Sequence, residues 1–175
     1  MGYLKNKYTK EYYMGKDSKG KPLKYGATST VDDMGNYVLR KQDLSILKKI
    51  YFKNKNVLAL GCGRGEELVY AIENGCNVKN SVGVDFSPEA IKIAKKLFND
   101  EKLDAPVFYT EDALDFVINY IPKVKVNKSK KFDIVIMFDF VEHVPREELE
   151  KILDKLKKLL KNKCILVINT PAYKY

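Results

Sequence analysis

Three glycines stand at alternate positions in the run Gly61-Cys62-Gly63-Arg64-Gly65, directly after the short apolar stretch Asn56–Leu60. Glycine lets a backbone turn sharply and approach a ligand without a Cβ atom in the way. The next stretch, Glu66–Asn74, has its apolar residues on one helical face, and the start of a helix offers free N–H groups and a positive dipole end. The pattern therefore predicts a ligand-binding loop between a strand and a helix.

Two carboxylates follow the next two apolar stretches. Asp85 lies 24 residues after Gly61, and Asp112 follows the next apolar stretch, Pro106–Thr110. A carboxylate at Asp85 can accept hydrogen bonds from both hydroxyls of a ribose, and one at Asp112 can accept from the amino group of adenine. Phe86, beside Asp85, can lie against the adenine ring. Together with the glycine loop, these residues predict a site for a ligand that contains adenosine.

The spacing of the glycines separates two classes of nucleotide ligand. A dinucleotide-binding loop has a third small residue five positions after its first glycine, and here that position is Glu66. A carboxylate that faces a pyrophosphate would be repelled by it. The G-x-x-x-x-G-K-[ST] run of a phosphate-binding loop is also absent from the sequence. The loop therefore suits an adenosine ligand that carries no phosphate.

These motifs resemble those of class I S-adenosylmethionine-dependent methyltransferases, and most closely the small-molecule O-methyltransferases and sugar- or antibiotic-tailoring enzymes. The resemblance extends from about Val57 to Thr170 and rests on the segments Val57–Glu67, Val82–Ile91, Thr110–Ala113 and Phe132–Val144. It implies that the cofactor is S-adenosylmethionine and that the acceptor is a small molecule. The residues that it assigns to the cofactor are Gly61, Cys62, Gly63 and Gly65 at the methionine part, Asp85 at the ribose, Phe86, Asp112 and Ala113 at the adenine, and Phe138 near the methionyl end.

Two features depart from the family pattern. The family usually has an acidic residue two positions before the first glycine, where this chain has Ala59. A polar anchor for the methionine part is therefore missing or is supplied by Glu66 or another group. The family sheet also has seven strands as a rule, whereas this sequence stops at Tyr175, just after a fifth. We expect either that the last strands are missing or that a partner covers the open edge of the sheet.

Glu142 and His143 follow the fourth apolar stretch, and His143 is the only histidine in the chain. Methyl transfer is a direct displacement at carbon, so the protein mainly positions two reactants in line. An alcohol acceptor must also lose a proton, and histidine is suited to take it near neutral pH. The pair is therefore a candidate catalytic group, although it can equally cap the next helix and pack locally.

A metal-assisted alternative uses the same region. Some RNA ribose 2′-O-methyltransferases carry a Glu-x-x-Glu-His metal motif, which Asp139, Glu142 and His143 match here, but those enzymes need a further histidine that this chain lacks. We therefore expect no metal at the site.

The formal charge of +9 is concentrated at the start of the chain, because residues 1–55 carry 13 Lys and Arg against five Asp and Glu. Such a segment can attract an anionic partner, such as RNA, a nucleotide-sugar or a phosphorylated metabolite, or it can be a solvated surface. Tyr12 and Tyr13 either face the acceptor or pack on the domain. We expect residues 1–55 to form a lid or substrate segment with a helix, and residues 56–175 to form the cofactor-binding core.

The positioning elements are five apolar stretches that alternate with amphipathic ones, which predicts an α/β fold with a doubly wound, mostly parallel sheet and helices on both faces. Helices are expected at 38–52, 66–74, 87–98, 113–120 and 145–160, a lysine-rich connection at 122–131, and the fifth strand at 165–168. The sequence has no apolar run long enough for a membrane span and no secretory signal at its start, which favours a cytoplasmic address. Besides a small-molecule methyltransferase, an RNA methyltransferase and a non-catalytic partner subunit remain alternatives.

Overall fold

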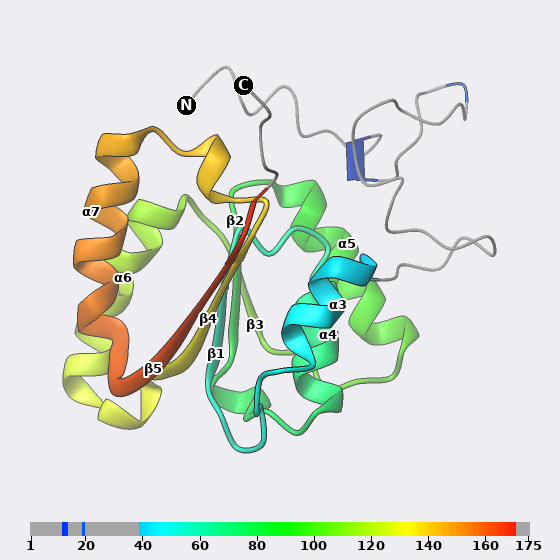
Figure 1. Ribbon diagram of the computed structural model, residues 1–175, viewed down its shortest axis with the longest axis horizontal. Helices are drawn as coiled ribbons and strands as arrows, with labels where there is room; N and C mark the ends of the chain where they lie inside the picture. Colours follow the sequence, from blue (N-terminus) through cyan, green and yellow to red (C-terminus); the bar gives the residue numbers. More distant parts are fainter. Residues whose placement is uncertain (1–11, 14–18, 20–38, 171–175) are drawn as a thin grey trace.

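The computed structural model describes residues 12–13, 19 and 39–170. Five parallel strands form one sheet in the order β3-β2-β1-β4-β5, with helices on both faces (Figure 1), as the sequence predicts. The strands are β1 Val57–Leu60, β2 Val82–Asp85, β3 Val107–Thr110, β4 Phe132–Phe138 and β5 Leu160–Asn169. The helices are α3 Lys41–Leu47, α4 Glu66–Glu73, α5 Pro88–Asp100, α6 Ala113–Val126 and α7 Arg146–Leu156, with short 3-10 turns η2 Val78–Asn80, η3 Lys128–Lys130, η4 Val141–His143 and η5 Lys157–Leu159.

Two apolar clusters hold the helices on the sheet. Successive side chains of β4 point to opposite faces, so that Val135 joins the cluster under α6 and α7, and Ile134 joins the cluster under α3, α4 and α5. Figure 1 shows these two groups of helices on either side of the sheet. Because both faces are covered, the central strands are almost entirely apolar, as expected for a buried parallel sheet.

The register of the strands brings the candidate residues to one edge. Leu60 at the end of β1 lies beside Val84 of β2, so the glycine loop and Asp85 begin at neighbouring points. The N-terminus of α5 follows at once, and Ser87 caps it by accepting a hydrogen bond from the backbone N–H of Ala90. Serine at the N-cap followed by proline in the first turn is a residue pattern that favours the start of a helix.

The predicted end of α6 at Tyr120 is wrong, since the helix continues through Pro122 to Val126. Proline removes one helical hydrogen bond, but Val124 remains buried in the same cluster as Tyr120. The Nζ atom of Lys123 also donates to the hydroxyl of Tyr109 at 2.8 Å. Continued burial of one helix face therefore outweighs the proline, and only η3 remains of the predicted lysine-rich connection.

Other boundaries differ by a few residues. The helix predicted at 38–52 is only the seven residues of α3, and α7 ends at Leu156, after which η5 leads directly into β5. The fifth strand is longer than the predicted 165–168. It extends because β4 offers a pairing partner from Phe132 to Phe138, which the apolar pattern of residues 160–164 does not reveal.

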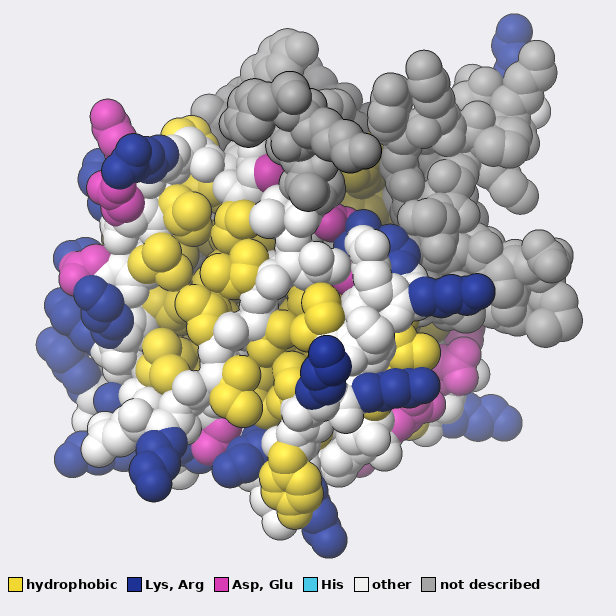
Figure 2. All heavy atoms as spheres, in the orientation of Figure 1, with side chains coloured by type: hydrophobic (Ala, Val, Ile, Leu, Met, Phe, Trp, Pro, Cys, Tyr) yellow, Lys and Arg dark blue, Asp and Glu magenta, His cyan; other side chains and the backbone are white. Residues whose placement is uncertain are grey.

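β5 lies at the edge of the sheet. Its side chains Ile165, Leu166 and Ile168 are each more than 40% exposed, and Figure 2 shows apolar side chains gathered over this part of the molecule. Within the described residues, no helix has the length and apolar character needed to cross a bilayer.

Asn56 joins the starts of β1 and β4 at the end of the sheet opposite the glycine loop. Its side-chain amide donates to the carbonyl oxygens of Ser129 and Lys131, both at 2.7 Å, and its backbone N–H donates to a carboxylate oxygen of Asp133. Lys161 of β5 donates to the same oxygen of Asp133 at 2.7 Å. These hydrogen bonds thus fix how β1, β4 and β5 are aligned with one another along the sheet.

We expect Asn56→Ala to lower the free energy of unfolding by about 2 kcal/mol, because two carbonyl oxygens lose their buried donor. Urea denaturation followed by circular dichroism measures the change. Asn119→Ala on the exposed face of α6 is the matched control, for which we expect a change within about 0.5 kcal/mol. Equal effects of the two substitutions would contradict the structural role of Asn56.

Candidate functional site

The glycine loop adopts the conformation that its glycines allow. Gly61, Gly63 and Gly65 have φ angles of 69°, 50° and 83°, which other residues rarely adopt. Gly65 is the N-cap residue of α4, and the backbone N–H of Cys62 donates to the carbonyl oxygen of Val84 in β2. The loop is therefore a tight turn that joins β1 to α4 and is hydrogen-bonded to the end of β2.

Asp85 binds this loop directly. One carboxylate oxygen accepts from the backbone N–H of Gly63 at 2.9 Å, and the other accepts from the N–H of Ser87 at 2.8 Å. The residue is only 6% exposed, and burial raises the pKa of its carboxyl group while these two hydrogen bonds lower it. A carboxylate has about four lone-pair positions, so two of them remain for a ligand.

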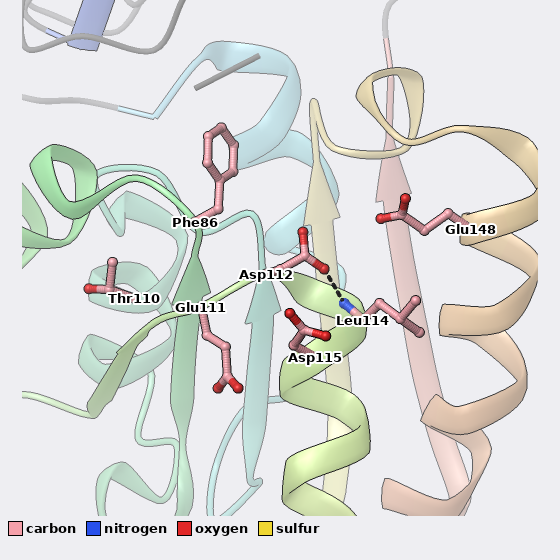
Figure 3. Close-up of a pocket in the computed structure, with 7 residues that line it drawn as sticks. All are labelled: Phe86, Thr110, Glu111, Asp112, Leu114, Asp115 and Glu148. Carbon is pink, nitrogen blue, oxygen red and sulfur yellow. Dashed lines mark hydrogen bonds between the residues drawn. The ribbon is translucent and has the colours of Figure 1, made fainter. Parts of the chain in front are cut away.

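A cavity of about 490 Å³ lies beyond the ends of β2 and β3 and is lined by Phe86, Thr110, Glu111, Asp112, Leu114, Asp115 and Glu148. Asp112 also caps α6, because one of its oxygens accepts from the backbone N–H of Leu114 at 2.9 Å. Figure 3 shows Glu148 reaching from α7 toward this end of α6, while the side chain of Glu111 points away. An aromatic ring and several acceptors thus border a space of the size that small ligands occupy.

Of the three residues predicted at the adenine, Phe86 and Asp112 line this cavity, whereas Ala113 packs against the apolar cluster under α6 and α7. The contribution of Glu148 was not predicted. Its Oε1 atom is buried without a hydrogen-bond partner, and burial raises the pKa of its carboxyl group, with the charge of Asp112 as the next cause. Nothing in the sequence around Glu148 distinguishes it from the other charged residues of α7.

Tyr12 and Tyr13 lie against the same edge of the sheet. Tyr13 is buried with Ala90 and Ile93 of α5, and its carbonyl oxygen accepts from the guanidinium group of Arg64 at 2.9 Å. Burial raises the pKa of the Tyr12 hydroxyl, and the charges of Asp139, Glu142 and Asp85 raise it further. The Tyr12 side chain packs with Tyr13 and Phe86 against α5, where carboxylates at the ends of β2 and β4 act on its hydroxyl group.

The end of β4 carries a network of charged groups. Asp139 has a φ angle of 46°, and one of its carboxylate oxygens pairs with Arg40 at 2.7 Å. Arg40 also binds Asp43 at 2.6 Å, and Asp43 accepts from the side chain of Asn169 at 2.5 Å. Phe138, the last residue of β4, is half-buried against the cluster that contains α3 and α4. Residues from α3, β4 and β5 are thus fixed together beside the loop.

Glu142 and His143 form η4, directly after β4. The Nε2 atom of His143 lies 3.9 Å from Glu142 Oε1, and the side chain of His143 is 35% exposed. The other oxygen of Glu142 accepts from the hydroxyl of Thr170 at 3.0 Å. Asp139, Glu142 and His143 do not make a metal-binding group of three ligands, and neither do other such side chains in the described part of the chain.

Two glutamates lie in the first turn of α4, of which Glu67 is buried and Glu66 is half-buried. Glu66 pairs with Arg64 at 2.5 Å, in agreement with its predicted place beside the loop. Glu67 is 8% exposed, and burial followed by the charge of Glu66 raises the pKa of its carboxyl group well above the usual value. The sequence contains one signal for Glu67, namely that it lies on the helix face shared with Leu68 and Ala71, but no role was predicted for it.

Three comparisons with known proteins bear on this site. The sequence profile of a family described as "Methyltransferase domain" matches residues 51–174. The O-methyltransferase atr3 of Stereocaulon alpinum is 24% identical over 119 residues, which cover 68% of this chain and 33% of that protein. The chain thus spans about a third of the curated relative that it matches.

Two solved structures share the fold. The magnesium protoporphyrin IX methyltransferase of Synechocystis PCC 6803, solved with bound S-adenosylmethionine, is 21% identical with a TM-score of 0.52, and the match covers 69% of this chain and 52% of that one. PKMT2 from Rickettsia typhi, in complex with AdoHcy, is 26% identical with a TM-score of 0.51, and the match covers 70% of this chain and 23% of that one.

We expect Gly61→Ala to destabilise the protein more than Gly63→Ala. Both substitutions force alanine into a left-handed conformation, at a cost of about 1–2 kcal/mol. A Cβ atom at Gly61 would also lie 2.6 Å from the Phe140 ring, whereas one at Gly63 would meet its nearest atom at 4.0 Å. Urea denaturation measures both changes.

Adding Phe140→Ala to each glycine variant separates the two causes, because it removes the contact but not the backbone strain. We expect the excess cost of Gly61→Ala over Gly63→Ala to shrink in that background. An unchanged difference would contradict the contact between Gly61 and Phe140.

Proposed function

Because the chain belongs to the class I S-adenosylmethionine-dependent methyltransferase family, we propose that it transfers a methyl group from S-adenosylmethionine to an oxygen or nitrogen of a small-molecule acceptor. The observation that carries the proposal is the position of Asp85. Its carboxylate binds the glycine loop at Gly63 and stands next to Phe86, which lines the cavity. The loop, the ribose acceptor and the adenine cavity of the proposed cofactor site are therefore contiguous.

The residues present suit this cofactor. In the proposal, Gly61, Cys62, Gly63 and Gly65 hold the methionine part, Asp85 accepts from the ribose hydroxyls, Phe86 and Asp112 border the adenine, and Phe138 lies near the methionyl end. A Cβ atom at Gly63 would have no neighbour closer than 4.0 Å, so a ligand can approach the backbone there. When bound, S-adenosylmethionine supplies a methyl group on a positively charged sulfur.

The acceptor would bind at the end of β4, where Tyr12, Glu142 and His143 border the site. An oxygen acceptor is favoured by the relationship to an O-methyltransferase. His143 would take the proton of the acceptor hydroxyl, with Glu142 3.9 Å away to orient the ring. Tyr12 would close the site from the side of α5, since it packs there beside Tyr13 and Phe86.

The RNA alternative depends on the basic residues 1–55, of which the structure describes only 12–13, 19 and 39–55. Within these residues, Arg40 is bound by Asp43 and Asp139, whereas Lys41, Lys48, Lys49 and Lys53 are exposed. Salt-dependent RNA binding that is lost on deletion of residues 1–30 would favour this alternative over the small-molecule acceptor.

We expect the protein to bind S-adenosylmethionine and its demethylated product, S-adenosylhomocysteine, in a calorimeter. Asp85→Ala should weaken both affinities by about tenfold to a hundredfold, because hydrogen bonds to a charged group contribute about 1.5–3 kcal/mol. Glu73→Ala, on the exposed end of α4, is the control. If the unmodified protein binds neither compound at millimolar concentration, the proposed function is wrong.

We expect His143→Gln to slow methyl transfer by about a hundredfold or more while leaving the affinity for S-adenosylmethionine unchanged, because only proton removal from the acceptor depends on it. Transfer of a radiolabelled methyl group to a panel of phenols, sugars, carboxylic acids and amines measures the rate. An equal rate in the variant would leave His143 with a packing role only.

A further inference from the structure

The family position for an acid before the glycine loop is occupied by Ala59, and the structure shows what surrounds it. Ala59 is fully buried in β1, in an apolar cluster with Cys62, Leu68 and Ala71. Its own side chain therefore cannot receive a positively charged group. The following argument rests on the proposed function, since it concerns how the methionine part of S-adenosylmethionine is held.

Glu67 is a buried acid and is our candidate replacement for the acid that is absent at Ala59. It lies in the first turn of α4, two residues after Gly65, and shares a helix face with Leu68 and Ala71. Those two residues belong to the cluster around Ala59, so the side chain of Glu67 leaves the helix toward the same region. The first turn of α4 thus carries a buried acid on the helix face that packs on the cluster around Ala59.

The charged groups that act on the carboxyl group of Glu67 are all acidic. They are Glu66 in α4, Asp43 in α3 and Asp85 in β2, and each raises the pKa of Glu67. Glu67 in turn raises the pKa of the Cys62 thiol in the glycine loop, where among charged groups only Asp85 has a larger effect. No basic group is among the causes that act on the pKa of Glu67.

The nearby cations are engaged elsewhere. Arg64 pairs with Glu66 and donates to the carbonyl of Tyr13, and Arg40 is held by Asp43 and Asp139. Within residues 39–170, no cation pairs with the carboxyl group of Glu67, and the hydrogen bond that lowers its pKa comes from the backbone of Glu67 itself. Because the residue is only 8% exposed, ionisation of this carboxyl group without a cationic partner costs free energy, unless a ligand supplies the positive charge.

We propose that Glu67 receives the α-ammonium group of the methionine part of S-adenosylmethionine, in place of the acid that is absent at Ala59. The ligand then brings the positive charge that the surrounding carboxylates lack. A purely structural role would instead keep Glu67 as a neutral group that packs under α4.

Proton release distinguishes the two roles. In the free protein, burial and the charges of Glu66, Asp43 and Asp85 raise the pKa of Glu67, so the group holds a proton over a pH range where it would normally be ionised. An ammonium group beside it favours the ionised form and lowers that pKa. Binding therefore releases a proton, and the affinity rises with pH until the pKa of the free protein is passed. Cys62 does not contribute, because burial raises the pKa of its thiol.

The test is calorimetry at about pH 6, where an α-amino group stays protonated, in two buffers of different ionisation enthalpy. The ligands are S-adenosylhomocysteine and methylthioadenosine, which lacks the amino-acid part. We expect Glu67→Gln to lower the affinity for S-adenosylhomocysteine by at least about tenfold and to change the affinity for methylthioadenosine by less than about twofold. We also expect it to reduce the proton release on binding of S-adenosylhomocysteine. Asp85 and Glu66 titrate in both proteins, so the difference between them isolates Glu67.

The double variant Ala59→Asp/Glu67→Leu supplies an independent check. It returns the acid to the family position, and we expect it to bind S-adenosylhomocysteine more tightly than Glu67→Leu alone. The proposal is overturned if Glu67→Gln lowers the affinity for both ligands equally, or if it changes neither the affinity nor the proton release. Either result leaves the proposed function standing. If the unmodified protein binds methylthioadenosine but not S-adenosylhomocysteine, or binds no adenosine compound, both proposals fail.

Discussion

The hydrogen bonds of the Asp85 carboxylate hold the site together. One joins β2 to the glycine loop at Gly63, and the other joins it to the start of α5 at Ser87. The glycine loop, the end of β2 and the start of α5 therefore depend on one buried group. The register of β1 and β2 makes this contact possible, because Leu60 and Val84 lie side by side and bring the loop within reach. Any change in strand register would separate the two groups and release the loop.

The local charge at the site is opposite to that of the whole chain. The sequence has a net charge of +9, yet burial raises the pKa of Asp85, Glu66 and Glu67 around the loop. The sign of the resulting pH effect follows from these shifts. A carboxyl group whose pKa is higher in the folded protein than in the unfolded chain favours folding at low pH, and that contribution is lost as pH rises through the folded value. Ionisation of these carboxyl groups thus opposes folding, and a cationic ligand would offset this effect.

The sequence was sufficient for the parts that follow from local patterns. The parallel sheet, the glycine loop, the Ser87 cap and the position of Asp85 all correspond to short motifs with a direct physical meaning. The errors and omissions concern contacts between distant residues. The continuation of α6 past Pro122 depends on the burial of Val124 under α7, and the place of Glu148 in the cavity depends on how α7 packs against α6. Glu67 was overlooked because a glutamate in the first turn of a helix is usually exposed, where it favours the helix dipole.

The double role of Asp85 has a consequence for how ligand binding and loop order are related. Both of its oxygens already accept one backbone hydrogen bond, and each retains a further lone pair. Ribose hydroxyls can therefore bind without displacing Gly63 or Ser87. Such hydroxyls would favour the ionised form of Asp85, and an ionised Asp85 accepts more strongly from the N–H groups of Gly63 and Ser87. The ligand would thus strengthen the same two contacts that shape its site, so that the loop is most firmly held when adenosine is bound.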